Sequence, residues 1–305
     1  MTETTIRIVG RDAKGLRVGG AMLRDLLDPL VDAVQQSVRL RTEGRSRAPG
    51  AAPTWLAKAT AFDVEFRKGS TQLALLAEPL GALVPERFSQ LDMFEPFSPA
   101  STCIDIFVEA LDDALSSRTD SDRFDDGLID TFTGFGKVLD HHVRTFELHN
   151  GRTRTIERTS VESLKQLRRS IPADQRVRIA GTLDLLKHSN RIFAIELPTG
   201  TVRGVIVGDT DFGTLGQLLG REVMVSGLAK FRPSGRVLRI EADNIVPASG
   251  DTALWKHLPR PLFAELDVRT RREPQGPRSG VSAIFGQWPG DESDDEFDEA
   301  IRALS

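Results

Sequence analysis

Residues 175–247 carry the pattern that most restricts how this chain can fold, because they contain five short stretches of alternating apolar and polar residues. Alternation with a period of two is typical of strands that bury one face. A short helical piece, Leu215 to Leu219, follows the third stretch and ends at Gly220. The stretches contain, in order, Val177 and Ile179; Phe193, Ile195 and Leu197; Thr201 to Val207; Val223 to Phe231; and Val237 to Ile245. We therefore predict three strands, a helix and two further strands.

This order of elements resembles that of the OB-type fold, a five-stranded Greek-key barrel. Gly181 and Gly227 lie within predicted strands, where glycine suits the sharp bends of a small barrel. The resemblance implies an OB-like barrel over residues 173–248. It also implies that loops at one end of the barrel contact a ligand.

Residues 1–172 mix strand and helix patterns and are predicted to form an α+β domain. Helical spacing runs from Leu23 to Val38, and Asp28 followed by Pro29 predicts that a new helix begins there. The Asn150-Gly151 pair is a strong hairpin signal. Further strands are predicted around residues 6–8, 62–66, 71–75, 146–148 and 154–157, and further helices around 104–115, 128–139 and 161–171.

The remaining residues differ in composition from both domains. Residues 249–285 are predicted to be a partly docked arm followed by a basic linker rich in Pro and Gly, and residues 286–305 a short acidic helix. The predicted fold class is α+β, with a mixed N-terminal domain, an OB-like barrel and a flexible C-terminal arm that ends in this helix.

Composition limits the compartment in which such a chain works. Cys103 is the single cysteine of the 305 residues, so no internal disulfide can form. No stretch approaches the ~20 apolar residues that span a bilayer, and the first residues lack the apolar core of a signal peptide. We expect a cytoplasmic protein that does not enter membranes.

The sequence predicts neither a catalytic residue nor a cofactor. Phosphate-binding, dinucleotide-binding, zinc-protease and serine-hydrolase motifs are all missing. A metal site would have to recruit His142, Glu147 and His149, and surface positions are the simpler interpretation of these histidines. Cys103 begins an apolar helical face and is interpreted as a small core residue. We therefore expect no metal and no enzymatic activity, with an enzyme in residues 1–170 as a minor hypothesis.

The predicted barrel is locally basic. Residues 175–245 contain ten Lys or Arg against seven Asp or Glu, a balance of +3. Phosphate groups attract such surfaces, but single-strand binders also need aromatic residues on which bases stack, and only Phe193, Phe212 and Phe231 are available. The candidate nucleic-acid-binding residues are Arg178, Lys230, Arg232, Arg236 and Arg239. The alternative is a barrel that mainly mediates protein contacts or has an architectural role.

The last twenty residues contain the most distinctive pattern. Ser293 and Glu296 form a capping box, and Phe297, Ile301 and Leu304 share one helical face. Seven acids against one arginine give this segment a charge of -6, which favours a basic partner. The alternative is a helix that folds back on the chain's own surface. The candidate partner-binding residues are Trp288, Asp291, Glu292, Asp295, Glu296, Phe297, Ile301 and Leu304.

Around Trp288 and Pro289 the segment resembles the C-terminal tails of bacterial antitoxin-like proteins of the toxin–antitoxin kind. This resemblance covers about twenty residues and implies a toxin partner, such as a PIN-domain ribonuclease. The leading hypothesis is a neutralising or binding protein whose tail docks on a basic partner. The alternative is a nucleic-acid-binding accessory protein that acts through the barrel.

Overall fold

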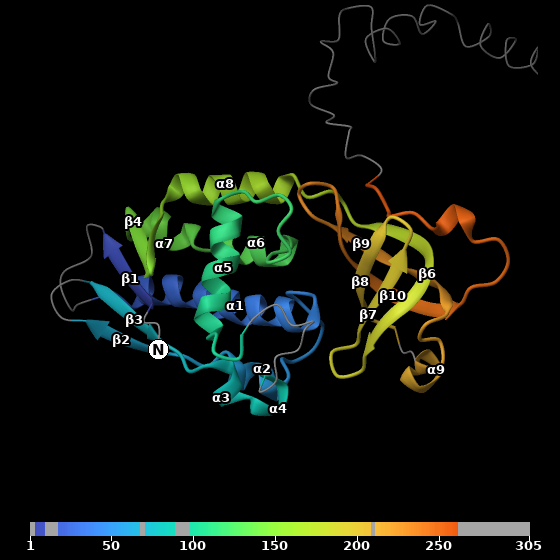
Figure 1. The fold of residues 1–305 in the computed structure, drawn as a ribbon. Helices are drawn as coiled ribbons and strands as arrows, with labels where there is room; N and C mark the ends of the chain where they lie inside the picture. The colour runs from blue at the N-terminus through green and yellow to red at the C-terminus, as the bar shows by residue number, and fades with distance from the viewer. Residues whose placement is uncertain (1–3, 10–17, 68–70, 89–97, 209–210, 262–305) are drawn as a thin grey trace, which may run out of the picture. The chain divides into compact units, whose positions relative to one another are not determined.

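The computed structural model describes residues 4–9, 18–67, 71–88, 98–208 and 211–261 (Figure 1). Met1–Pro261 form one compact unit, which contains two hydrophobic cores. We call the described residues up to 172 the N-terminal lobe and residues 173–248 the barrel. The predicted linker beyond Pro261 and the predicted helix over 286–305 lie outside the described residues.

The N-terminal lobe contains a five-stranded antiparallel sheet with the strand order β2-β3-β1-β4-β5. Ile6 lies opposite Leu73 on one side and Leu148 on the other, and all three are buried in the same core as the helices. The predicted hairpin at Asn150-Gly151 is confirmed, and Gly151 has the positive φ of 64° that this turn needs. The strands are β1 (Thr4–Val9), β2 (Asp63–Arg67), β3 (Gln72–Leu76), β4 (Thr145–Asn150) and β5 (Arg152–Ile156).

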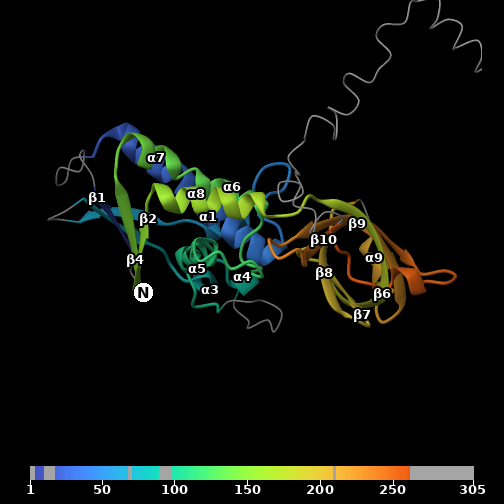
Figure 2. The same ribbon diagram turned by 90° about the horizontal axis from the view of Figure 1, so that it is seen from above.

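Helices of the N-terminal lobe supply most of its core, with α1 lying against α5, α6 and α7, and α8 against α6 (Figures 1 and 2). Among them α5 begins with a capping box in which Thr102 and Asp105 exchange hydrogen bonds. The helices are α1 (Gly20–Glu43), α2 (Thr54–Ala59), α3 (Leu80–Leu83), α4 (Pro85–Phe88), α5 (Cys103–Leu115), α6 (Asp126–Thr133), α7 (Gly136–His141) and α8 (Arg158–Arg169).

Two helix predictions were wrong. No new helix begins at Pro29, because α1 continues through it and keeps Leu26 and Leu30 buried on one face. Packing of that face outweighs the hydrogen bond that a proline removes. The helix predicted over 128–139 is divided into α6 and α7 at Gly134, where a Cβ atom would lie 3.2 Å from the Cβ of Pro29. Close approach to α1 therefore coincides with the break.

Residues 175–247 form the predicted closed barrel of five strands, in the order β10-β8-β7-β6-β9. The β8–β10 pair is parallel and the other pairs are antiparallel, and α9 lies between β8 and β9 in the sequence. Gly227 faces Ala242, and a Cβ atom there would lie 2.2 Å from the carbonyl oxygen of Glu241, so only glycine fits. The elements are β6 (Gln175–Lys187), β7 (Ile192–Leu197), β8 (Gly200–Ile206), α9 (Phe212–Gly216), β9 (Glu222–Phe231) and β10 (Val237–Pro247).

After the barrel, the described part of the arm contacts β9 through polar groups. Thr252 donates a 2.5 Å hydrogen bond to Glu222, and Lys256 pairs with the same carboxylate at 3.0 Å. The short 3-10 helix η1 (Ala253–Trp255) leaves the side chain of Leu254 at the surface, 83% exposed. None of the helices in the described ranges is both long and apolar enough to cross a lipid bilayer.

Candidate functional site

Arg239, one of the predicted nucleic-acid contacts, points toward the N-terminal lobe rather than into solvent. Its side chain is only 9% exposed, and its Nη2 atom lies 3.0 Å from Asp125 and 3.1 Å from Glu241. A guanidinium buried between two carboxylates cannot also reach a phosphate on an approaching strand. Arg239 therefore belongs to the structural contact between the barrel and the N-terminal lobe.

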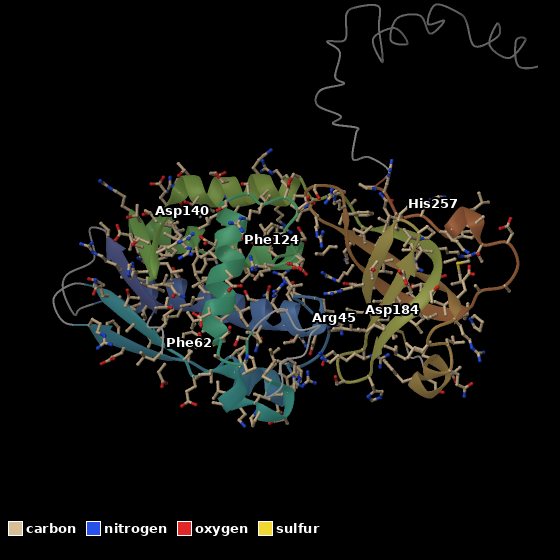
Figure 3. The ribbon with its side chains drawn as sticks, in the orientation of Figure 1. Arg45, Phe62, Phe124, Asp140, Asp184 and His257 are labelled. Carbon is tan, nitrogen blue, oxygen red and sulfur yellow. The ribbon has the colours of Figure 1, made fainter. Side chains whose placement is uncertain are left out.

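Asp125 is the centre of that contact. Its carboxylate caps α6 by accepting from the backbone N–H of Leu128 at 3.0 Å, and it also accepts from the backbone N–H and hydroxyl of Ser46. Burial alone would raise the pKa of Asp125, but the charge of Arg239 and these hydrogen bonds lower it below its usual value. The carboxylate is therefore held in its ionised form. Arg45 follows α1 (Figure 3) and interacts electrostatically with Arg239 and Glu241.

The β9–β10 turn, residues 232–236, also contacts the N-terminal lobe. Arg236 pairs with Asp120 at 3.2 Å, and the backbone N–H of Ser234 donates to the carbonyl of Thr119 at 3.2 Å. Within the barrel itself, Lys230 pairs with Asp174. Three of the five predicted phosphate-binding cations thus have acidic partners in the chain itself.

Arg178 and Arg232 are placed differently. Arg178 is exposed on β6 opposite Ser226, and it has no ion pair or hydrogen bond to any described side chain. Ser226 is four residues from Lys230 on β9, so Arg178 and Lys230 are separated by about 13 Å along the strands. Arg232 is half-buried, and its Nε atom has no partner among the described residues. The structure therefore does not gather the five predicted cations into one patch.

The surface that OB-type barrels commonly use for ligands is partly covered in this chain. That surface is the outer face of the second and third strands together with the loops after the first and fourth strands. Here these are β7, β8, the β6–β7 loop and the β9–β10 turn. In that loop Asn190 donates to the carbonyl of Thr42 and accepts from Arg87, each at 2.8 Å. On β8, Val205 lies so near Gly44 that a Cβ atom there would be 3.1 Å away. The N-terminal lobe thus contacts one end of the usual ligand face, while Glu196 of β7 and Arg203 of β8 remain exposed on it.

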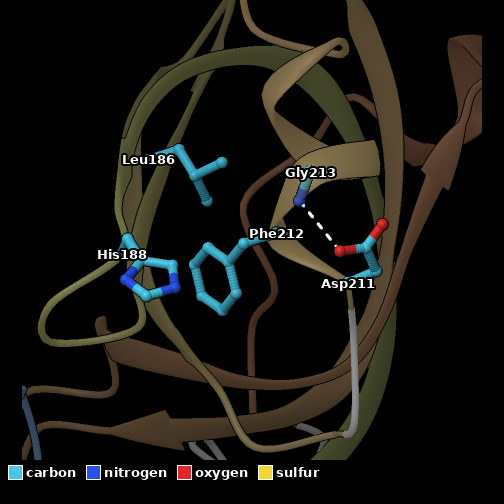
Figure 4. Close-up of a pocket in the computed structure, with 5 residues that line it drawn as sticks. All are labelled: Leu186, His188, Asp211, Phe212 and Gly213. Atoms are coloured by element: carbon cyan, nitrogen blue, oxygen red, sulfur yellow. Dashed lines mark hydrogen bonds between the residues drawn. The ribbon is translucent and has the colours of Figure 1, made fainter.

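A hollow of about 510 Å³ lies beside the β6–β7 loop, between the end of β6 and α9 (Figure 4). Its size is within the range of small-ligand sites. Five residues line it: Leu186, His188, Asp211, Phe212 and Gly213.

Phe212 is the aromatic residue of the barrel that is left partly accessible. Phe193 and Phe231 are buried in it, with 0% and 2% exposure, whereas Phe212 borders the hollow. The ring centroid of His188 lies 4.8 Å from that of Phe212, and the guanidinium of Arg191 lies 5.3 Å from the Phe212 centroid. Phe212 is a stacking candidate from the sequence, whereas His188 and Arg191 could not be predicted, because no local pattern joins residues more than twenty positions apart.

No nucleophile or metal site is evident in the part of the chain that the structure describes. Burial raises the pKa of the Cys103 thiol to about 12, so that thiol is neutral at physiological pH. His142 contacts Asp25 at 3.3 Å, while His149 contacts Thr153 at 2.8 Å, so the two histidines have separate partners. Within the described ranges, no three His, Cys, Asp or Glu side chains converge as metal ligands.

The predicted partner-binding residues lie outside the described residues, and they are Trp288, Asp291, Glu292, Asp295, Glu296, Phe297, Ile301 and Leu304. Comparison of the chain with protein-family models, with curated proteins and with solved structures gives no match.

Proposed function

We propose that this chain is a non-enzymatic, cytoplasmic binding protein whose C-terminal segment, residues 286–305, docks on a basic protein partner. The observation that carries the proposal is the charge of -6 on a segment whose apolar residues Phe297, Ile301 and Leu304 recur at helical spacing. Such a stripe needs an apolar groove, and its acids favour one with a basic rim. A nuclease toxin of the PIN-domain kind is the partner class that the antitoxin resemblance suggests.

Ion pairs within the N-terminal lobe and the barrel support this proposal. In the barrel, Lys230, Arg236 and Arg239 are paired with acids of the same chain. They are therefore occupied in holding the body together. The segment over residues 286–305, with seven acids and one arginine, instead has a net negative charge that can attract a basic partner.

Affinity capture tests the proposal with the intact chain, a chain that ends at residue 285, and two point variants. Phe297→Asp places a charge on the apolar stripe and should abolish capture of a basic partner, as the truncation should. Asp298→Asn is the matched control, because it changes charge beside the stripe and should mainly slow association. Equal recovery of the same partners by the intact and truncated chains would overturn the proposal.

A second candidate function is binding of single-stranded nucleic acid by the barrel, and the exposed edge of the Phe212 hollow favours it. An accessible aromatic ring next to His188 is the kind of surface on which unpaired bases stack. Arg178 and Arg232 remain as the cations for phosphate contacts. Binding of a labelled single strand should be strong at low salt and fall steeply as salt rises. No retention at low salt would remove this candidate.

A further inference from the structure

We propose that the hollow bordered by His188 and Phe212 is a binding site for one unpaired nucleobase. The proposal rests on the second candidate function, and it names the residues and the ligand chemistry. Its starting point is a cavity of about 510 Å³ lined by two aromatic rings, an aliphatic side chain and a carboxylate (Figure 4). Bases are bound in proteins by stacking on Phe or His together with hydrogen bonds to the base edge.

The aromatic rings are held in place before any ligand arrives. Arg191 lies over the ring of Phe212, and its Nε donates to the carbonyl of Ile206 at 3.0 Å while its Nη2 donates to that of Gly208. The backbone of Arg191 has a φ of 55°, which a non-glycine residue seldom adopts. Neighbouring contacts thus fix this loop, and a fixed platform loses little freedom on binding.

Asp211 determines which part of a nucleotide enters the hollow. Hydrogen bonds from the Thr214 side chain and from the backbone N–H groups of Gly213 and Thr214 lower the pKa of Asp211, so it is ionised at neutral pH. An anionic carboxylate repels phosphate and accepts hydrogen bonds from amino groups. The hollow therefore takes the base and leaves the phosphates outside.

The same carboxylate predicts a preference among bases. Cytosine, adenine and guanine carry an exocyclic amino group that can donate to Asp211, whereas the one donor on the base edge of thymine, its N3–H, lies between two carbonyl oxygens that the carboxylate repels. The strand that fits this hollow is therefore unpaired and bears amino-substituted bases. A double-stranded nucleic acid is excluded, because its bases are stacked and paired.

The test measures fluorescence anisotropy of labelled ten-residue oligo(dC) and oligo(dT) with the full chain at low salt. Phe212→Ala should weaken oligo(dC) binding about tenfold, with a smaller loss for His188→Ala. Phe66→Ala is the matched control, because Phe66 is an exposed phenylalanine of β2 in the N-terminal lobe, 42% exposed, and its loss should leave binding unchanged. Asp211→Asn keeps a capping side chain for α9 and should narrow the preference for oligo(dC) over oligo(dT).

Phe212→Leu separates base stacking from folding, because leucine keeps an apolar side chain against the barrel. This variant should unfold at nearly the wild-type temperature and still bind oligo(dC) weakly. Wild-type affinity in both Phe212 variants would overturn the base site while leaving nucleic-acid binding intact. Failure of the wild-type chain to bind either oligonucleotide would remove the second candidate function and the site together.

Discussion

Two parts of the barrel surface differ in whether the chain itself supplies a partner for their side chains. On the side that faces the N-terminal lobe, Arg236 and Arg239 form ion pairs with carboxylates of that lobe. The β6–β7 loop contributes Asn190 to the same contact. At the hollow, His188 and Phe212 border open space instead. Basic charge on a barrel therefore does not by itself mark a ligand site. What distinguishes the two regions is whether the chain already supplies the partner.

The β6–β7 loop belongs to both regions. Asn190 is buried and faces Thr42 and Arg87, while His188 is exposed beside Phe212. Arg87 in turn lies over the ring of Trp55 at 4.1 Å. The loop that forms one wall of the hollow is therefore anchored by the N-terminal lobe, and the two regions are connected through three consecutive positions.

The largest expected effect comes from removing the centre of the contact between lobe and barrel. Asp125→Ala should lower the free energy of unfolding by about 3–5 kcal/mol, because it removes one of the two carboxylates that hold the buried Arg239 and also removes the cap of α6. Denaturant unfolding measures this. Asp120→Ala is the control, since Asp120 is 52% exposed and its pair with Arg236 should contribute at most about 1 kcal/mol. Equal losses in the two variants would mean that the buried pair has no special role.

The dependence of stability on pH should follow from the same carboxylate. Since the pKa of Asp125 is lower in the folded chain than its usual value, its contribution is present above the unfolded pKa and is lost as pH falls through the folded pKa. Unfolding experiments should therefore show stability decreasing below roughly pH 5. In Asp125→Asn the decrease of stability at acidic pH should be smaller. A variant with the wild-type pH profile would assign the acid sensitivity to other carboxylates.

A smaller effect is expected where α1 ends against the barrel. Gly44 has a φ of 72°, and a Cβ atom would also lie 3.1 Å from Val205, whereas Gly50 has a φ of 87° and nothing within 4 Å. Alanine is strained at both positions, at a cost of about 1 kcal/mol. Gly44→Ala should cost more than Gly50→Ala, because the barrel must also shift. If Gly50→Ala is the more destabilising of the two, the contact with Val205 of β8 does not determine the cost of a side chain at position 44.

Local patterns in the sequence predicted the strands and the longer helices, but neither the short helices α2, α3 and α4 nor the contacts between distant elements. Alternation located the barrel strands, because strand burial repeats every second residue, and the Asn150-Gly151 pair located the hairpin. The continuation of α1 through Pro29 could not be predicted, because it depends on a buried face whose partners come from α5 and α6. Arg239 was predicted as a free cation because Asp125, 114 positions earlier, is not a sequence neighbour.

The candidate site was only partly predictable for the same reason. Phe212 could be named from composition, but its pairing with His188 depends on how α9 meets the end of β6. The acidic segment over 286–305 was found from charge and spacing alone, and its role stays a prediction.

The most direct test of the two-region account compares two exposed arginines of one barrel. Arg236 is paired with Asp120, whereas Arg178 has no partner among the described side chains. Single-strand affinity should be measured across a range of salt concentrations for the wild-type chain, Arg178→Ala and Arg236→Ala. We predict that Arg178→Ala lowers the slope of log affinity against log salt by about one, and that Arg236→Ala leaves it unchanged. The reverse result, with only Arg236→Ala lowering the slope, would contradict the account.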